Sequence, residues 1–155
     1  KQESKKNGTV GCVVLDKQGN LTAGTSTGGM FKKRWGRIGD SPVIGAGTYA
    51  DNNSCAVSCT GHGEYFIRHA VAFDVCARYK YLKESVEKAA DYIIHTELNT
   101  NAGNGGLIAV DKLGNIAMPY NSGGMFRGFL YKEKGSPEIK KGCGIGKKIV
   151  VVGEK

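Results

Sequence analysis

The apolar segments of this chain are mostly short and strand-like, and there are too many of them for its helices to cover. About six or seven segments have the composition and turn boundaries of strands, and only two have a helical pattern. Most of the strand segments are continuous apolar runs, which are typical of strands buried on both faces. Two helices cannot cover both faces of such a sheet. We therefore expect an α+β chain that needs a second polypeptide to close its core.

The predicted elements are separated by segments rich in glycine, asparagine and proline, which are typical of turns and loops. In order, they are a buried strand at 10–15, a turn at 16–20, a strand at 21–26, a loop region at 28–49, a strand at 55–59, a turn at 60–63, a helix over about 64–81, a second helix over about 86–96 that begins after Ser85, a loop at 99–105, a second hairpin over 106–119 and a last strand at 148–152.

The two predicted hairpins repeat each other. The pattern Asp-Lys-x-Gly-Asn of residues 16–20 recurs at 111–115, and the Gly-Gly-Met-Phe that begins at Gly28 recurs from Gly123. Asp-x-x-Gly-Asn is a common hairpin turn, which explains the first pattern but not the second. We interpret the repeat as two equivalent strand pairs, each ending in a glycine loop that faces one site.

Charge and hydropathy exclude two classes of partner. The net charge is +8, but much of the excess lies near the two ends, and no stretch interleaves basic residues with stacking aromatic residues. No segment approaches the roughly 20 apolar residues that a membrane span needs. We therefore expect neither a nucleic acid nor a membrane as partner.

The five cysteines are odd in number and contain no Cys-x-x-Cys pair, and the three histidines show no zinc spacing with them. We expect no metal site and free, mostly buried thiols, which favour a reducing compartment. The cytoplasm is the expected location. The periplasm and the lysosome stay open, because a targeting signal would precede Lys1.

Thr9 stands at a junction between a polar, lysine-rich stretch that ends at Gly8 and the apolar run of residues 9–15. One interpretation is the ordinary first residue of a strand. The other is a nucleophile that becomes an N-terminus when the Gly8–Thr9 bond is cut. The freed α-amine, with a pKa of roughly 7.7–8.0, would then serve as the general base for the neighbouring hydroxyl.

Three further polar groups lie in loops or at strand ends. Thr25 and Ser26 are expected to make local backbone bonds. Arg37 and Asp40 would fit the carboxylate and ammonium of an amino acid head group, or they form a surface pair worth about 0–1 kcal/mol.

The segment 60–63, Thr-Gly-His-Gly, ends a strand before a helix, which suits backbone N–H groups that stabilise an oxyanion. His62 lacks a Gly-x-Ser-x-Gly partner motif, so we expect it at most to line the site.

Five blocks in order, at 9–16, 25–29, 36–42, 45–50 and 60–64, resemble the plant-type L-asparaginase and isoaspartyl peptidase family, which includes the glycosylasparaginases. The resemblance runs from Gly8 to about Phe129 and covers the β subunit of these N-terminal nucleophile (Ntn) hydrolases. It implies a four-layer αββα sandwich, a cut between Gly8 and Thr9, and an (αβ)2 assembly with an α subunit from the same precursor. Residues 1–8 would be a linker remnant and 9–155 the β subunit, whose tail after about 130 matches nothing.

The resemblance also implies a role for each matching residue. Thr9 would be the nucleophile and Thr27 the threonine that hydrogen-bonds to it. Thr60 and Gly61 would complete the catalytic set as the oxyanion hole. Arg37 at the α-carboxylate, Asp40 at the α-amine and Gly63 as part of the pocket wall would bind the substrate.

The expected reaction is hydrolysis of the side-chain amide of L-asparagine and of β-aspartyl dipeptides, without a cofactor. A structural sodium ion would belong to the α subunit. Two alternatives stay open: a glycosylasparaginase that cleaves the sugar–asparagine amide, and a silent homologue that is never processed. While residues 1–8 stay attached, Thr9 has no free amine and the form should be inactive.

Overall fold

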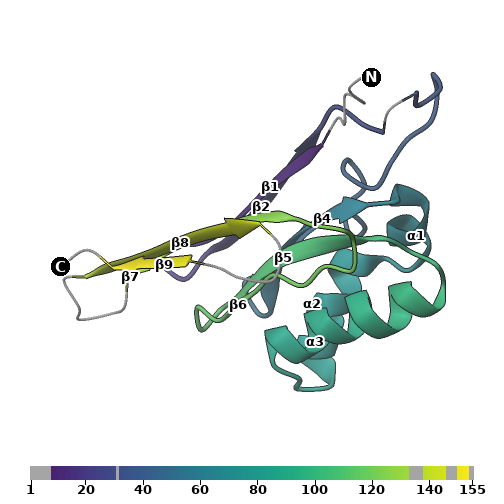
Figure 1. Ribbon diagram of the computed structural model, residues 1–155. Coiled ribbons are helices and arrows are strands. Elements are labelled where there is room, and N and C mark those ends of the chain that lie inside the picture. The colour runs from purple at the N-terminus through teal and green to yellow at the C-terminus, as the bar shows by residue number, and fades with distance from the viewer. Residues whose placement is uncertain (1–7, 31, 133–137, 146–149, 154–155) are drawn as a thin grey trace. The chain divides into compact units, whose positions relative to one another are not determined.

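The structure is a computed structural model, which describes residues 8–30, 32–132, 138–145 and 150–153 (Figure 1). The chain divides into two compact units, residues 1–121 and 122–155. Part of the predicted strand at 148–152 lies outside the described residues.

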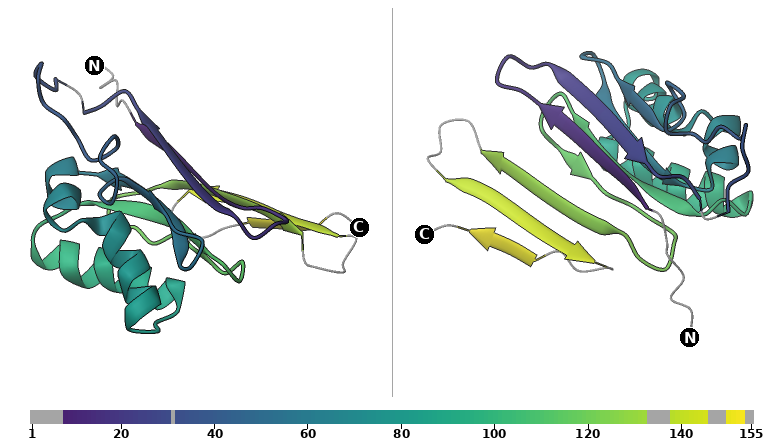
Figure 2. Two further views of the ribbon diagram at one scale, coloured as in Figure 1. Left: turned by 180° about the vertical axis from the view of Figure 1, so that it is seen from behind. Right: turned by 90° about the horizontal axis from the view of Figure 1, so that it is seen from above.

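The first unit has three layers. A hairpin of β1 (Thr9–Leu15) and β2 (Leu21–Thr27) lies on one face of a four-stranded antiparallel sheet, and helices cover the other face (Figure 2). The sheet has the order β3-β4-β5-β6, and its strands are β3 (Thr48–Ala50), β4 (Cys55–Gly61), β5 (Gly105–Asp111) and β6 (Ile116–Ala117). The helices are α1 (Gly63–Arg68), α2 (Val71–Tyr81), α3 (Val86–Tyr92) and the π-helical segment η1 (Ile93–Leu98).

The central strands are buried on both faces, as their continuous apolar sequences predict. Alternate residues of β4, namely Cys55, Val57 and Cys59, pack with the helices in the larger core. The residue between the first two, Ala56, packs with Leu21 of the hairpin in a second, smaller core. Successive side chains of β4 thus point alternately toward the helices and toward the hairpin.

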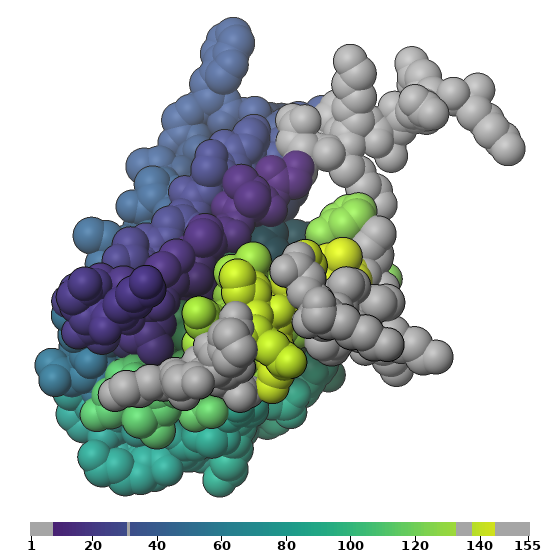
Figure 3. Space-filling view, turned by 90° about the vertical axis from the view of Figure 1, so that its left-hand side faces the viewer, coloured from purple at the N-terminus to yellow at the C-terminus, as the bar shows by residue number. Residues whose placement is uncertain are grey.

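The outer face of the hairpin carries exposed apolar side chains. Val10 is 67% exposed and Val14 is 47% exposed, so the expectation of a fully buried strand at 10–15 is wrong for this chain by itself. The hairpin lies at the surface in Figure 3. The prediction of an α+β chain is confirmed, and the described residues of the first unit supply three layers.

The repeated turn sequences form the same turn. The carboxylate of Asp16 accepts the N–H groups of Gln18 and Asn20 and the Asn20 side-chain amide. Asp111 accepts the equivalent three bonds from Leu113 and Asn115. Gly19 and Gly114 have φ of 87° and 89°, which glycine adopts without strain. The repeat of the turns therefore has a structural cause, whereas the second Gly-Gly-Met-Phe leads into a strand of the other unit.

The predicted helix over 64–81 is two helices, because Ala70 has a left-handed backbone with φ 45°. The break lets α2 start against the loop that precedes β3: the N–H groups of Ala72 and Phe73 donate to the carbonyls of Ala46 and Gly45. These tertiary bonds satisfy N–H groups that a helix start leaves unpaired. The sequence pattern around Ala70 holds no helix-breaking residue, so it could not predict this break.

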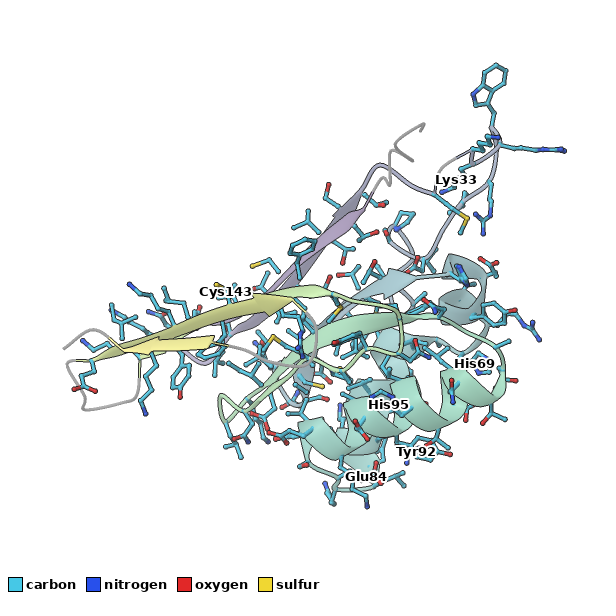
Figure 4. The ribbon with its side chains drawn as sticks, viewed as in Figure 1. Lys33, His69, Glu84, Tyr92, His95 and Cys143 are labelled. Atoms are coloured by element: carbon cyan, nitrogen blue, oxygen red, sulfur yellow. The ribbon has the colours of Figure 1, made fainter. Side chains whose placement is uncertain are left out.

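The second helix begins at its predicted N-cap, where Ser85 accepts the Lys88 N–H. It changes into η1 at Ile93, so the helical segment extends to Leu98, slightly past its predicted end. Arg78 of α2 donates to both carboxylate oxygens of Glu84, in the connection between α2 and α3, at 2.9 and 3.3 Å. Its guanidinium also lies 3.8 Å from the ring centroid of Tyr92; Glu84 and Tyr92 are labelled in Figure 4.

The second unit is a three-stranded antiparallel sheet of β7 (Phe126–Lys132), β8 (Ile139–Ile145) and β9 (Val150–Gly153), in that order. The sequence predicts only part of the last strand. β8 is rich in glycine and lysine, which obscure the apolar alternation typical of strands.

Asn121 is expected to stabilise the first unit by joining η1, the loop before β5 and the start of β5. Its side-chain amide donates to the carbonyls of Ile94 and Gly103, and its oxygen accepts the Gly105 N–H. Asn121→Ala removes three hydrogen bonds and should lower the free energy of unfolding by about 2–3 kcal/mol, measured by urea denaturation of the full-length protein. The control is Asn53→Ala, an exposed turn residue, which should change it by less than about 0.5 kcal/mol. Equal effects of the two variants would contradict the role of Asn121.

Candidate functional site

The layers bring three of the predicted threonines to one end of the space between the hairpin and the central sheet. Thr9 and Thr27 are direct cross-strand partners at the open end of the hairpin. Further along the layers, Thr25 bonds to Ser58, and Thr60 lies two residues beyond Ser58 on the same face of β4. Leu21 of β2 lies in one core cluster with Ala56 of β4, and further along both strands Thr25 bonds to Ser58, so β2 and β4 run in the same direction. Thr27 and Thr60 each lie two residues beyond this bond, which places them at the same end.

The Thr9 hydroxyl has one side-chain partner. It donates to the Thr27 hydroxyl oxygen over 2.9 Å. The Gly29 N–H donates to the same oxygen, also over 2.9 Å, and so fixes the Thr27 side chain from the loop that follows β2. Two donors thus converge on the Thr27 oxygen and fix its position beside the Thr9 hydroxyl.

Gly61 ends β4 in a crowded backbone setting, paired with Gly105. A Cβ atom at Gly61 would collide with the Asn104 carbonyl oxygen and would lie 2.5 Å from the Phe66 ring. The close approach requires glycine at this position, which explains the Thr-Gly sequence at the strand end in steric terms.

Asp40 is a buried carboxylate in a loop. The residue is 5% exposed, and Oδ2 has no hydrogen-bond partner among the described residues. Burial raises the pKa of this carboxyl above its ordinary value, and the charge of Lys33, in the loop after β2 (Figure 4), acts weakly in the opposite direction. A buried carboxylate with an unpaired oxygen is suited to receive a cationic ligand.

Gly63 and Gly47 pack against Asp40 and shape the space around it. A Cβ at Gly63 would lie 2.8 Å from both the backbone nitrogen and Oδ1 of Asp40. A Cβ at Gly47 would lie 2.5–2.7 Å from backbone atoms of Asp40 and Ser41. Larger residues at these two positions would displace the carboxylate.

Arg37 does not pair with Asp40. Its Nη2 donates to Oε2 of Glu64, in the first turn of α1, over 2.6 Å, and its Nη1 lies 3.8 Å from the Met30 sulfur. The sequence blocks contain Glu64 but gave no reason to single it out. The contact with Glu64 places the guanidinium beside α1 and leaves further N–H donors for a ligand.

Thr25 does not make the local backbone bonds expected of it. Its hydroxyl donates to the Gly47 carbonyl over 3.0 Å and lies 2.6 Å from the Ser58 hydroxyl. These bonds join β2 to the central sheet. The pleat of β2, which points Thr25 toward the sheet in the same direction as Thr27, is the sequence signal that could have found them.

His62 precedes α1, and its exposed ring has Tyr65 as its aromatic neighbour. Its N–H donates to the Asn104 carbonyl. Within the described part of the chain, no group of three or more His, Cys, Asp or Glu side chains could hold a metal ion. All five cysteines are free, and Cys55, Cys59 and Cys76 are buried. None of the helices in that part is long and apolar enough to cross a membrane.

The chain thus contains a threonine pair at the open end of a hairpin, a strand that ends in a sterically required glycine, and a buried loop carboxylate. Residues 1–139 match the model of a protein family described as Asparaginase. The chain therefore belongs to the plant-type asparaginase family, and the resemblance drawn from its sequence blocks is confirmed.

The relatives have consistent names. The isoaspartyl peptidase of Salmonella typhimurium is 54% identical over 129 residues, which cover 83% of this chain and 41% of that protein. The isoaspartyl peptidase of Escherichia coli is 49% identical, over 86% of this chain and 44% of that protein. The isoaspartyl peptidase/L-asparaginase of Mus musculus is 47% identical, over 78% and 37%. The chain spans less than half the length of these relatives.

Proposed function

We propose that the full-length protein is an amidohydrolase that cleaves itself between Gly8 and Thr9. The released Thr9 then hydrolyses the side-chain amide of L-asparagine and the β-aspartyl bond of isoaspartyl dipeptides. The observation that carries the proposal is the 2.9 Å hydrogen bond between the Thr9 and Thr27 hydroxyls at the start of the hairpin. The names of the relatives support this substrate class.

In the proposed reaction, the Thr9 hydroxyl attacks the amide carbon while the freed α-amine of the same residue takes its proton. Thr27, which accepts the hydrogen bond of the Thr9 hydroxyl, orients that hydroxyl for the attack. Thr60 and Gly61 donate to the oxyanion, a contribution typically worth about 10²–10³ in rate for each donor. The α-ammonium gives this proton to the leaving nitrogen as the C–N bond breaks, so that ammonia or an amine leaves. Water then cleaves the acyl-enzyme ester, which releases aspartate and restores the Thr9 hydroxyl. We assign the oxyanion role to the strand end, since α1 has only six residues.

Substrate binding is proposed to use the charges of the loop that follows β2. Arg37 would bind the substrate α-carboxylate with donors that Glu64 does not occupy, and Asp40 would accept the α-ammonium at its unpaired Oδ2. Gly63 would leave room for the substrate beside Asp40. These groups need no cofactor. The sodium ion that the resemblance implies would lie in the α subunit, so no residue of this chain is assigned to it.

The proposed partner is an α subunit from the same precursor, in an (αβ)2 assembly. The exposed Val10 and Val14 on the outer face of the hairpin support a covering polypeptide, which would complete the four-layer αββα sandwich. A cytoplasmic location belongs to the same proposal and is supported by the five free thiols.

The test compares three substrates with the full-length protein. Release of ammonia from L-asparagine and of amino acids from β-aspartyl dipeptides supports the proposal. Cleavage of glycosylated asparagine alone would assign a glycosylasparaginase instead. Turnover of none of them by a folded protein would assign the silent homologue.

The pH dependence of kcat/KM is expected to have two steps on the acidic side. The α-amine of Thr9 must be neutral, so kcat/KM falls about tenfold per pH unit below roughly pH 8. Asp40 must be ionised to bind an ammonium, and burial holds its pKa above the ordinary 3.8, so protonation begins at a higher pH than for a free aspartate. Below that pKa the fall steepens to about a hundredfold per unit. The steepening should be absent in Asp40→Asn, and its persistence in that variant would contradict the assignment.

A further inference from the structure

Two hydroxyls join the hairpin to the central sheet directly behind the threonine pair. The Thr25 hydroxyl of β2 and the Ser58 hydroxyl of β4 are 2.6 Å apart, and Ser58 is 3% exposed. Thr25 donates its single proton to the Gly47 carbonyl over 3.0 Å. Ser58 must therefore be the donor to Thr25, since a hydroxyl has only one proton. The chain of bonds runs in one direction, from Ser58 through Thr25 to Gly47.

Gly47 transmits this connection to Asp40. The Gly47 N–H donates to the Asp40 carbonyl over 3.1 Å, and the Gly47 carbonyl accepts the Cys59 N–H over 2.9 Å as well as the Thr25 hydroxyl. The close packing of Gly47 on the Asp40 backbone leaves little freedom for one to move without the other. The position of the hairpin is therefore tied to the position of the loop carboxylate.

The strand β1 can lie close to the Ser58 hydroxyl because it has a glycine at this position. A Cβ at Gly11, the cross-strand partner of Thr25, would collide with the Ser58 oxygen. Thr25 lies two residues before Thr27, and Ser58 lies two residues before Thr60, in each case on the same face of the strand. The bond between Thr25 and Ser58 thus fixes the two strands two residues before Thr27 and Thr60.

We propose that Thr25 and Ser58 are positioning residues that fix the nucleophile at its working distance from substrate held by Asp40. The proposal rests on the proposed function. Neither residue is assigned to bind the substrate, so their loss should lower kcat and leave KM nearly unchanged. A displacement of about 1 Å between nucleophile and substrate can cost about a hundredfold in rate.

The experiment measures kcat and KM for β-aspartyl dipeptide hydrolysis by the full-length protein, with kcat referred to the concentration of processed chain. Thr25→Val keeps the shape of the side chain and removes the hydroxyl, and Ser58→Ala breaks the same bond from the other layer. Both should lower kcat about tenfold or more, with KM within about twofold of the parent. Thr25→Ser, which keeps the hydroxyl, should restore most of kcat.

The kcat of the double variant should be little lower than that of either single variant, because the two substitutions remove the same interaction. The control is Thr100→Val, because the hydrogen bond of the Thr100 hydroxyl in the described part of the chain is local, to the Thr96 carbonyl four residues earlier. It should leave kcat unchanged. If Thr25→Val does not fold, the inference is tested with Ser58→Ala alone, because that substitution removes only one oxygen atom.

An active parent with unchanged kcat in Ser58→Ala and Thr25→Val would overturn the inference alone. A rise in KM at constant kcat would also overturn it, since it would place the effect on substrate binding. A folded, processed parent that hydrolyses neither asparagine nor β-aspartyl dipeptides would overturn the proposed function and the inference together.

Discussion

Thr9→Ala is expected to leave the precursor uncut and to lower turnover by at least about 10⁴-fold, because the variant has neither an attacking oxygen nor a new N-terminus. Among the described residues, the Thr9 hydroxyl makes one side-chain hydrogen bond, to Thr27 at the open end of the hairpin, so its loss should leave the fold intact. Intact mass and initial rates of ammonia release measure the two effects, and the melting temperature reports the fold.

The matched control is Thr9→Ser, which retains the hydroxyl and the capacity to form an α-amine. It should still be cut and should keep measurable activity. Hydrolysis by Thr9→Ala at the parental rate would remove Thr9 from the mechanism and leave the 2.9 Å bond to Thr27 as a structural contact only.

Asp40→Asn is expected to lower kcat/KM for L-asparagine by about 10²–10³-fold, since it leaves a buried substrate ammonium without its opposite charge. Asparagine is close to aspartate in size, so Gly47 and Gly63 should still pack against it. Steady-state kinetics with the full-length protein measure the loss, which should appear mainly in KM.

Two controls separate charge from stability. Asp74→Asn, in α2, removes another carboxyl whose pKa is raised by burial, and it should leave kcat/KM unchanged. An asparagine analogue that lacks the α-amine should react equally slowly with the parent and with Asp40→Asn. Equal losses for Asp40→Asn with asparagine and with that analogue would refute the assigned ammonium contact.

Local sequence was sufficient where local bonds determine the structure. The two Asp-x-x-Gly-Asn turns are built from bonds within five residues, and the Ser85 N-cap bonds three residues ahead. The strand β5 was predicted because a continuous apolar run admits burial on both faces. The polar residues of the site were found because their types and order match a family, and the structure places Thr9 beside Thr27.

Long-range bonds account for what the sequence missed. The break at Ala70 depends on bonds from the start of α2 to Gly45 and Ala46, more than 20 residues earlier. Thr25 was expected to bond locally, and its partners Gly47 and Ser58 lie 22 and 33 residues away. The exposure of Val10 reflects a face that this chain does not cover with its own described residues. The break at Ala70 and the exposure of Val10 leave no pattern within a short window, whereas the alternation of β2 indicates only the direction of Thr25 and not its partners.

The intact mass of the catalytically active protein shows whether Thr9 is its N-terminal residue. Activity should belong to a polypeptide whose first residue is Thr9, and the rate at which activity appears should follow the cut at Gly8–Thr9. An intact Gly8–Thr9 peptide bond in a preparation that splits β-aspartyl dipeptides at the full rate would contradict this expectation, because the α-amine would then be absent as a base.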